Sequence, residues 1–88
     1  MQVDFTKHFS KQLDHLHDEV LRGKLRKIVS TVISASTDRD IPNLKKLKGH
    51  SSAYRIILDD YRIGLFIEDN KVIFAAFEHR KDIYNKFP

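Results

Sequence analysis

The hydrophobic pattern of the chain changes its period near the middle. From about residue 18 to residue 35, apolar positions recur every three or four residues with lysines and arginines opposite them, which predicts an amphipathic helix. Its apolar stripe consists of Leu21, Leu25, Ile28, Val29, Val32 and Ile33. From residue 53 onward, apolar and polar positions largely alternate, as they do in β-strands. The change of period predicts helices in the first half and a sheet in the second.

The first half of the chain is predicted to hold a short strand and two helices. Residues 1–5 alternate apolar and polar side chains, and Thr6 then suits the N-cap of a helix over residues 7–16. That helix places Phe9, Leu13 and Leu16 on one side. The second helix begins near Asp18 and ends before Pro42, because proline biases the preceding residue away from helical geometry. We expect the two helices to form an antiparallel hairpin.

The second half of the chain holds three strand-like segments, at residues 53–58, 61–67 and 71–77. Short breaks at Asp59-Asp60 and at residues 68–70 separate them, and loops this short predict hairpins. The whole chain, residues 1–88, is therefore predicted to be a single α+β domain. An N-terminal strand and a two-helix hairpin precede a three-stranded antiparallel meander, and the helices cover one face of the sheet.

A two-residue turn at Asp59-Asp60 fixes the register of the first predicted hairpin. It pairs Leu58 with Tyr61, Ile57 with Arg62 and Arg55 with Gly64. If the second turn pairs Ile67 with Val72, regular pairing continues with Phe66 opposite Ile73, Gly64 opposite Ala75 and Arg62 opposite Phe77. The face that carries Ile56, Ile63 and Leu65 is apolar and is predicted to lie under the helices.

The other face of the predicted sheet carries cations. Arg55 and Arg62 share it, and His79 continues their row just beyond the last strand. Gly64 and Ala75 leave room there for a ligand to approach the sheet. An ordinary solvated face is the alternative for any one arginine, but the shared parity of the three residues favours a site.

Composition narrows the functional classes. The 88 residues are 41% hydrophobic and 32% charged, which is typical of a folded globular domain rather than a disordered chain. The absence of cysteine excludes disulfides, thiol catalysis, zinc ribbons and iron–sulfur clusters. A net charge of +4 favours polyanionic partners such as RNA or DNA. No apolar run approaches the roughly 20 residues of a membrane span, so we expect no membrane role. We expect a cytoplasmic location, with which the absence of cysteine is compatible.

A basic stretch precedes the first strand of the meander. Lys45, Lys46 and Lys48 lead into Gly49, which allows the chain to turn. Lysines in such a loop can contact phosphates, and the three are predicted to bind RNA. The alternative is a solvated basic loop with no ligand.

The segment EHRKDIY, residues 78–84, combines three kinds of chemistry where the last strand ends. Histidine transfers protons near neutral pH, so His79 can act as an acid or a base. Arg80 offers a planar fork for phosphate oxygens, and Tyr84 can stack on a base or transfer a proton. These are the groups that RNA cleavage by internal attack requires. The alternative is an exposed His-Arg pair with Tyr84 as a C-terminal anchor packed on the core.

Neither a metal nor a cofactor is expected. His15 and His17 lie two positions apart on a helix and point in different directions, and Asp59-Asp60 is better explained by turn chemistry. The chain contains none of the glycine-rich phosphate loops, serine-hydrolase elbows or zinc-protease motifs.

Taken together, these segments resemble a known family. The stretch LKG, followed by YRI, DYRIGLFI and KVIFAAFEHRKDIY, is similar to the RelE/ParE toxin superfamily of type II toxin–antitoxin modules. The resemblance covers nearly the whole chain, and the pair DYRIG and HRKDIY is its most specific part. It implies a small sheet with two helices on one face and an open, positively charged concave face.

The resemblance to RelE-like members also implies a set of site residues. Their functional positions fall on Arg55, Arg62, Arg80 and Tyr84, with an acid–base role for His79 in some relatives. Some members carry a second basic residue where this chain has Ile57, so His79, Tyr84 or a neighbouring lysine would have to supply the base. Arg62 and Arg80 would hold the scissile phosphate, and Arg55 would position the backbone.

The implied activity is that of a ribosome-dependent mRNA endonuclease, or mRNA interferase, which inhibits translation by directing a 2′-hydroxyl onto the scissile phosphate. Its partners would be the ribosome, mRNA and a cognate antitoxin encoded by an adjacent small gene. Two alternatives stay open. One is a ParE-like, non-enzymatic toxin that inhibits DNA gyrase, and the other is an inactive, RNA-binding member of the fold.

Overall fold

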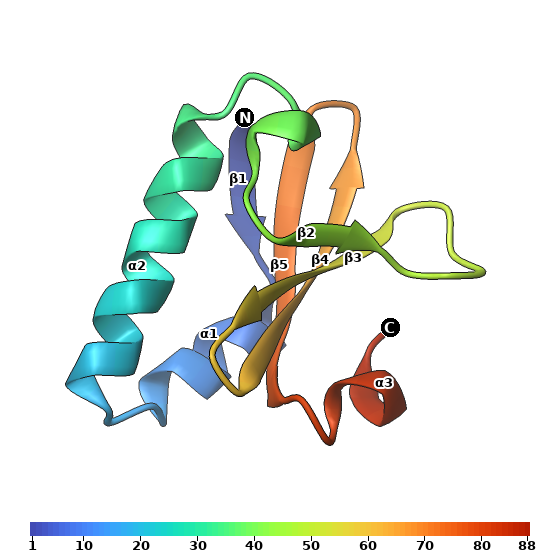
Figure 1. The fold of residues 1–88 in the computed structure, drawn as a ribbon. Helices are drawn as coiled ribbons and strands as arrows, with labels where there is room; N and C mark the ends of the chain where they lie inside the picture. Colours follow the sequence, from blue (N-terminus) through green and yellow to red (C-terminus); the bar gives the residue numbers. More distant parts are fainter.

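A computed structural model describes residues 1–88 as an α+β fold built on one five-stranded sheet (Figure 1). The elements in chain order are β1 (Gln2–Phe5), α1 (Lys7–Asp14), α2 (Glu19–Ser34), a 3₁₀ turn η1 (Asp38–Asp40), β2 (Leu44–Lys46), β3 (Ala53–Leu58), β4 (Tyr61–Glu68), β5 (Lys71–His79) and α3 (Ile83–Lys86). The strand order is β1-β5-β4-β3-β2. None of the helices has the length and apolar character that crossing a membrane requires.

Both predicted helix starts are confirmed by side-chain caps. The Thr6 side chain accepts a hydrogen bond from the backbone N–H of Phe9 at 3.1 Å, and Asp18 caps Leu21 in the same way at 3.1 Å. Each cap satisfies a backbone donor that a helix leaves free in its first turn. The guanidinium of Arg22 then donates to the carbonyl oxygens of Leu13 and Leu16, and so ties the start of α2 to the end of α1.

The sheet is larger than the predicted three-stranded meander. Strands β3, β4 and β5 do form that meander, but β2 adds to β3 in antiparallel fashion and β1 lies parallel to β5. The predicted antiparallel meander is therefore confirmed as the middle of a larger mixed sheet, in which only the pairing of β1 with β5 is parallel. Strand β2 has only three residues, two of them lysines, so it has no hydrophobic alternation that would distinguish it from a loop.

The register of the first hairpin is as predicted, with Arg55 opposite Gly64 and Ile57 opposite Arg62. The second hairpin begins in the predicted register and then shifts at a β-bulge between Gly64 and Leu65 of β4. Beyond the bulge, Gly64 lies opposite Ala76 instead of Ala75, and Arg62 lies opposite Glu78 instead of Phe77. The extra residue on β5 reverses which face the following side chains occupy.

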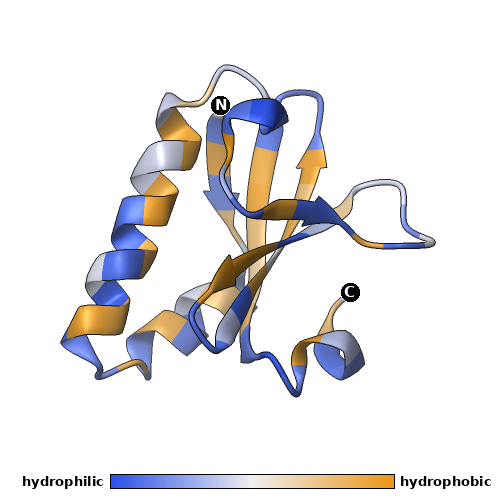
Figure 2. Cartoon of the chain, in the orientation of Figure 1, coloured by the Kyte–Doolittle hydropathy of each residue, from blue (hydrophilic) through white to orange (hydrophobic).

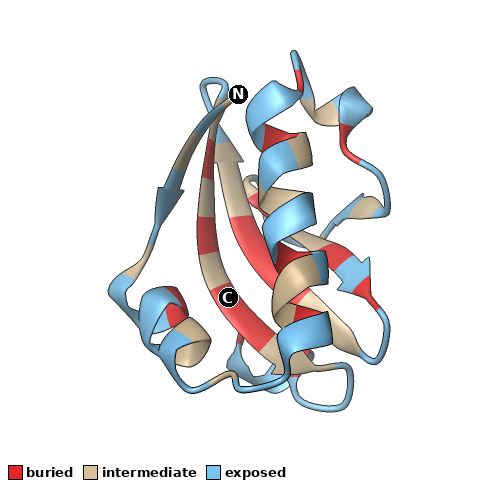
Figure 3. Ribbon diagram, turned by 90° about the vertical axis from the view of Figure 1, so that its left-hand side faces the viewer, coloured by how far each residue is buried: buried red, intermediate tan, exposed pale blue.

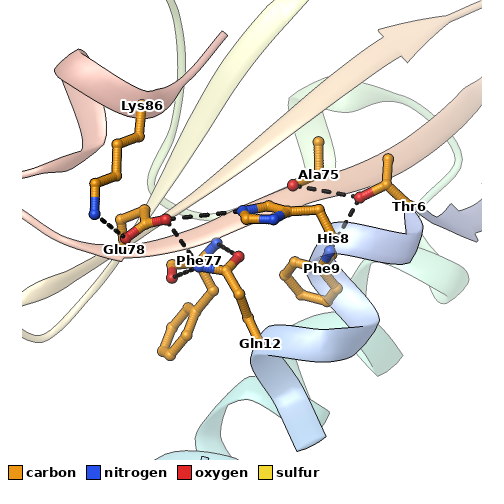
Figure 4. Close-up of polar contacts among 8 residues, drawn as sticks. All are labelled: Thr6, His8, Phe9, Gln12, Ala75, Phe77, Glu78 and Lys86. Atoms are coloured by element: carbon orange, nitrogen blue, oxygen red, sulfur yellow. Dashed lines mark hydrogen bonds and ion pairs between the residues drawn. The ribbon is translucent and has the colours of Figure 1, made fainter. Parts of the chain in front are cut away.

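Beyond the end of β1, the outer edge of β5 has no neighbouring strand. Side chains at the start of helix α1 and within it supply the hydrogen-bond partners there. The Thr6 hydroxyl donates to the carbonyl of Ala75, the extra residue of the bulge, at 3.3 Å. The Gln12 amide donates to the carbonyl of Phe77 at 2.7 Å and accepts from its N–H at 2.8 Å (Figure 4). Gln12 thereby satisfies Phe77 as a neighbouring strand would, and the bulged edge has hydrogen-bond partners where β1 has ended.

The main core lies between the two long helices and the sheet. Apolar residues of α2 face the strands (Figure 2), and the buried positions gather in β4, β5 and the sheet-facing side of α2 (Figure 3). The rings of Phe5, Phe9 and Phe74 pack together, with centroids 5.5–5.8 Å apart. The opposite face carries a separate, smaller cluster of Ala53, Ala76, Ile83 and Phe87.

Candidate functional site

The short helix α3 occupies the sheet face opposite α1 and α2 (Figure 1). Ile83 on this helix and Phe87 just after it are buried, and the Phe87 ring lies directly over Gly64. A Cβ atom at Gly64 would come within 2.6 Å of that ring. The room predicted above Gly64 therefore exists, but the C-terminal segment of the chain itself fills it.

Tyr84 lies between these two anchors and is not itself an anchor. Its side chain is 63% exposed, which rules out the alternative in which Tyr84 is packed on the core. It lines a groove of about 420 Å³. The other lining residues are Lys45, Lys46, Leu47, Lys48 and Arg55. The structure thus brings the three predicted RNA-binding lysines together with Arg55 and Tyr84, and we call this the basic groove.

Arg55 and the β2–β3 loop shape one wall of the basic groove. One terminal nitrogen of Arg55 donates to the carbonyl of Asn43 at 3.1 Å, which fixes the half-buried side chain beside β2. A guanidinium carries five N–H donors, so a single such bond leaves donors for a ligand. The lining contains four cationic residues and no carboxylate side chain. Its electrostatic character therefore favours an anion such as a phosphate.

A second depression of about 310 Å³ adjoins the basic groove and shares three of its lining residues, Leu47, Lys48 and Tyr84. Its remaining lining residues are His50, Phe87 and Pro88. The sequence pattern does not single out His50, because nothing in the sequence places the β2–β3 loop beside α3. The only local indication that His50 could take part in the site is that it is a titratable side chain two residues after Lys48.

Arg62 and Arg80 lie at the β3–β4 turn and are not among the residues that line the basic groove. One terminal nitrogen of Arg62 donates to the carbonyls of Asp59 and Tyr61, at 3.0 and 2.8 Å. The backbone N–H of Arg80 donates to the Asp60 carbonyl at 2.8 Å, and its Nε lies 3.9 Å from the Asp60 carboxylate. Both arginines therefore contact this turn, and the bulge brings Arg80, two residues beyond Glu78, into step with Arg62. Arg62 shares its sheet face with Arg55, as predicted.

His79 does not continue the row of Arg55 and Arg62, and that prediction is wrong. The bulge places His79 opposite Tyr61, on the face that α1 and α2 cover. The two rings meet edge to face, with centroids 5.6 Å apart and planes at 72°, and Nδ1 of His79 accepts from the N–H of Lys81 at 3.2 Å. The place in the row that parity assigns to His79 is taken by Glu78, opposite Arg62.

Glu78 connects three elements through a largely buried carboxylate, 13% exposed (Figure 4). It accepts a hydrogen bond from the Gln12 amide at 2.8 Å. Lys86 of α3 lies 3.8 Å from one oxygen, and His8 of α1 lies 3.9 Å from the other. The carboxylate therefore links β5 to both α1 and α3. No group of three or more His, Asp or Glu side chains is arranged to hold a metal ion.

Individual known proteins, rather than a family model, show the relationships of this chain. No family model matches it. Toxin RelE3 of Methanocaldococcus jannaschii is 35% identical over 89 residues, which span the whole of both chains. The solved RelE-type complexes described next share the fold of this chain.

Three solved toxin–antitoxin complexes have similar structures. The RelB–RelE complex of Methanococcus jannaschii matches with a TM-score of 0.79 and 32% identity, over 97% of this chain and 99% of the other. The RelE–RelB complex of Pyrococcus horikoshii gives 0.74 and 20% identity, over 93% and 97% of the two chains. The intact RelBE complex of E. coli gives 0.68 and 24%, over 89% and 94%. With a full-length relative at this identity and an architecture shared with RelE structures, the chain belongs to the RelE family of type II toxin–antitoxin toxins.

Proposed function

We propose that this toxin is a ribosome-dependent mRNA endonuclease and that the basic groove binds the mRNA. The observation that carries the proposal is the composition of the groove, in which three lysines and Arg55 surround the exposed Tyr84 ring. Lysine and arginine contact phosphate oxygens, and an aromatic ring stacks on a nucleobase. Single-stranded RNA presents both features along one strand.

In this proposal the chemistry is internal attack by a 2′-hydroxyl on the adjacent phosphate. Arg55 and the lysines position the strand, and Tyr84 stacks on a base or transfers a proton. Arg62 and Arg80 lie at the β3–β4 turn, at the other end of β3 from the β2–β3 loop, and contact a flanking phosphate of the same RNA strand after exchanging their bonds to the turn. Arg55 and Lys48, which line the groove with Tyr84, stabilise the charge that develops on the oxygens of the scissile phosphate. The contact of His79 with Tyr61 argues against a direct role for this histidine.

The solved relatives are complexes with RelB antitoxins, and we propose a corresponding antitoxin partner for this chain, encoded by an adjacent small gene. An acidic segment of such a partner would compete with RNA for the basic groove, because both ligands bring negative charge to the same cations. The RelE-named relatives favour this function over gyrase inhibition.

Purified protein added to programmed ribosomes tests the proposal, with the 5′ ends of the mRNA mapped by primer extension. The wild type should cut within the codon that the ribosome presents. Arg55→Ala and Tyr84→Ala should each reduce the single-turnover rate by at least tenfold. Lys11→Ala, an exposed change on α1, serves as the control and should cut normally. Intact mRNA combined with loss of gyrase supercoiling would support the ParE-like alternative, and salt-dependent RNA binding without cleavage would support an inactive RNA-binding protein.

A further inference from the structure

Cleavage by a 2′-hydroxyl requires a group that removes its proton, and Ile57 leaves the base unidentified. Histidine is the side chain that most readily exchanges protons near neutral pH. The chain has five histidines, His8, His15, His17, His50 and His79. The first three belong to α1 or to the loop that follows it, and His79 packs against Tyr61 under the helices. His50 is the one histidine near the basic groove, because it lines the depression that adjoins this groove.

The position of His50 is set by a tight turn in the β2–β3 loop. Its backbone N–H donates to the carbonyl of Leu47 at 3.3 Å, and Gly49 between them has a φ of +82°, a conformation that glycine adopts without strain. The side chain is exposed and lines the depression that Lys48 and Tyr84 share with the groove. A nucleotide seated in that depression therefore lies beside Lys48, His50 and Tyr84 together.

We propose that His50 is the general base of the cleavage reaction, an inference that rests on the proposed endonuclease function. The neutral imidazole takes the proton of the 2′-hydroxyl as that oxygen bonds to phosphorus. The bond between phosphorus and the 5′-oxygen breaks, and the 5′-oxygen takes a proton from the Tyr84 hydroxyl. The products are a 2′,3′-cyclic phosphate and a 5′-hydroxyl end. Solvent then returns a proton to Tyr84 and removes one from His50.

The pH dependence of single-turnover cleavage on ribosomes tests this role. The wild-type rate should rise with pH while the base loses its proton and should then level off. His50→Gln should lower the rate about 100-fold, the lower end of the range for losing a general base, and should abolish the rise assigned to that base. His79→Gln is the matched control and should keep the wild-type pH profile. A His50→Gln enzyme with wild-type rate and profile overturns the assignment. An unchanged unfolding free energy in urea confirms that the variant is folded.

A binding measurement separates this inference from the proposed function. In NMR titrations with a trinucleotide that carries a 2′-deoxyribose at the cleavage position, the ring resonances of His50 and Tyr84 should shift, whereas those of His79 should not. Wild-type cleavage with no perturbation of His50 overturns the His50 assignment alone. If the wild type leaves ribosome-bound mRNA intact, the endonuclease function fails, and the His50 role fails with it.

Discussion

The two faces of the sheet are packed in different ways. The face under α1 and α2 is closed by a cluster of 13 buried residues, including Phe9 and Phe74, which have no exposed surface. The opposite face is covered by a cluster of four residues, and two of these, Ile83 and Phe87, come from the C-terminal segment. The first face contains most of the apolar burial that stabilises the fold. The second combines a small apolar anchor with exposed cations, so substitutions on the two faces should affect different properties.

The largest effect on stability is expected on the helix-covered face. Phe74→Ala removes a ring that contacts both Phe5 and Phe9, and should lower the free energy of unfolding by about 3–5 kcal/mol. Phe66→Ala is the matched change on the other face, where the side chain is half-buried beside Phe87, and should cost clearly less. Urea denaturation measures both. Equal losses would mean that the two faces contribute alike to stability.

The second effect concerns the anchor of α3. Gly64→Ala places a methyl group where the Phe87 ring lies, and the resulting shift should cost about 1–3 kcal/mol. It should also displace Tyr84 and slow RNA cleavage. In a Phe87→Ala background the ring is absent, so adding Gly64→Ala should have little further effect on the unfolding free energy. Full additivity of the two changes in urea denaturation would show that the contact between Gly64 and Phe87 does not hold the helix.

A loss of similar size is expected at the edge of β5. Gln12→Ala leaves the N–H and the carbonyl of Phe77 without their partner and should cost about 1–3 kcal/mol. The neighbouring exposed change Lys11→Ala should cost less than about 0.5 kcal/mol. Hydrogen exchange at the Phe77 amide should accelerate only in the Gln12 variant. Unchanged exchange would indicate that α1 does not protect this edge.

The smallest effect on stability and a large effect on RNA binding are expected in the basic groove. Replacing Lys45, Lys46 and Lys48 together with alanine should leave the unfolding free energy nearly unchanged, because all three side chains are exposed. The slope of log affinity against log salt for single-stranded RNA should fall in magnitude by about 2, because each of the three lost phosphate contacts contributes roughly 0.7 to it.

A control triple variant, with Lys7, Lys11 and Lys27 changed to alanine, alters the net charge equally. Its salt slope should stay close to that of the wild type. Equal slopes for the two triple variants would show that net charge alone, and not the basic groove, governs RNA binding.

The sequence allowed the hairpin registers to be predicted as far as the turns determined them. The two-residue turn at Asp59-Asp60 placed Arg55 and Arg62 on one face, and the structure agrees. The bulge could not be predicted, because residues 74–77 are all apolar and contain no polar side chain that marks the alternation. A single extra residue was enough to move His79 to the other face and Glu78 into its place.

The composition of the basic groove was predictable in part. Three lysines, Arg55 and Tyr84 were identified from their residue types and from the family resemblance. Their meeting point was not predictable, because it depends on α3, a single turn of helix whose anchors are separated by only three residues. So short an element has too few positions to show a helical period. His50 was missed for the same reason, because the depression that it lines is formed together with that helix.

The brevity and charge of β2 have a further consequence for how the molecule behaves at high concentration. An outer strand exposes backbone groups that can pair with the sheet of another molecule, and lysines on a short outer strand discourage this. Lys45 and Lys46 occupy two of the three positions of β2. The cations that line the groove thus also repel a second copy of the chain from the open edge, so neutralising them would weaken RNA binding and promote self-association.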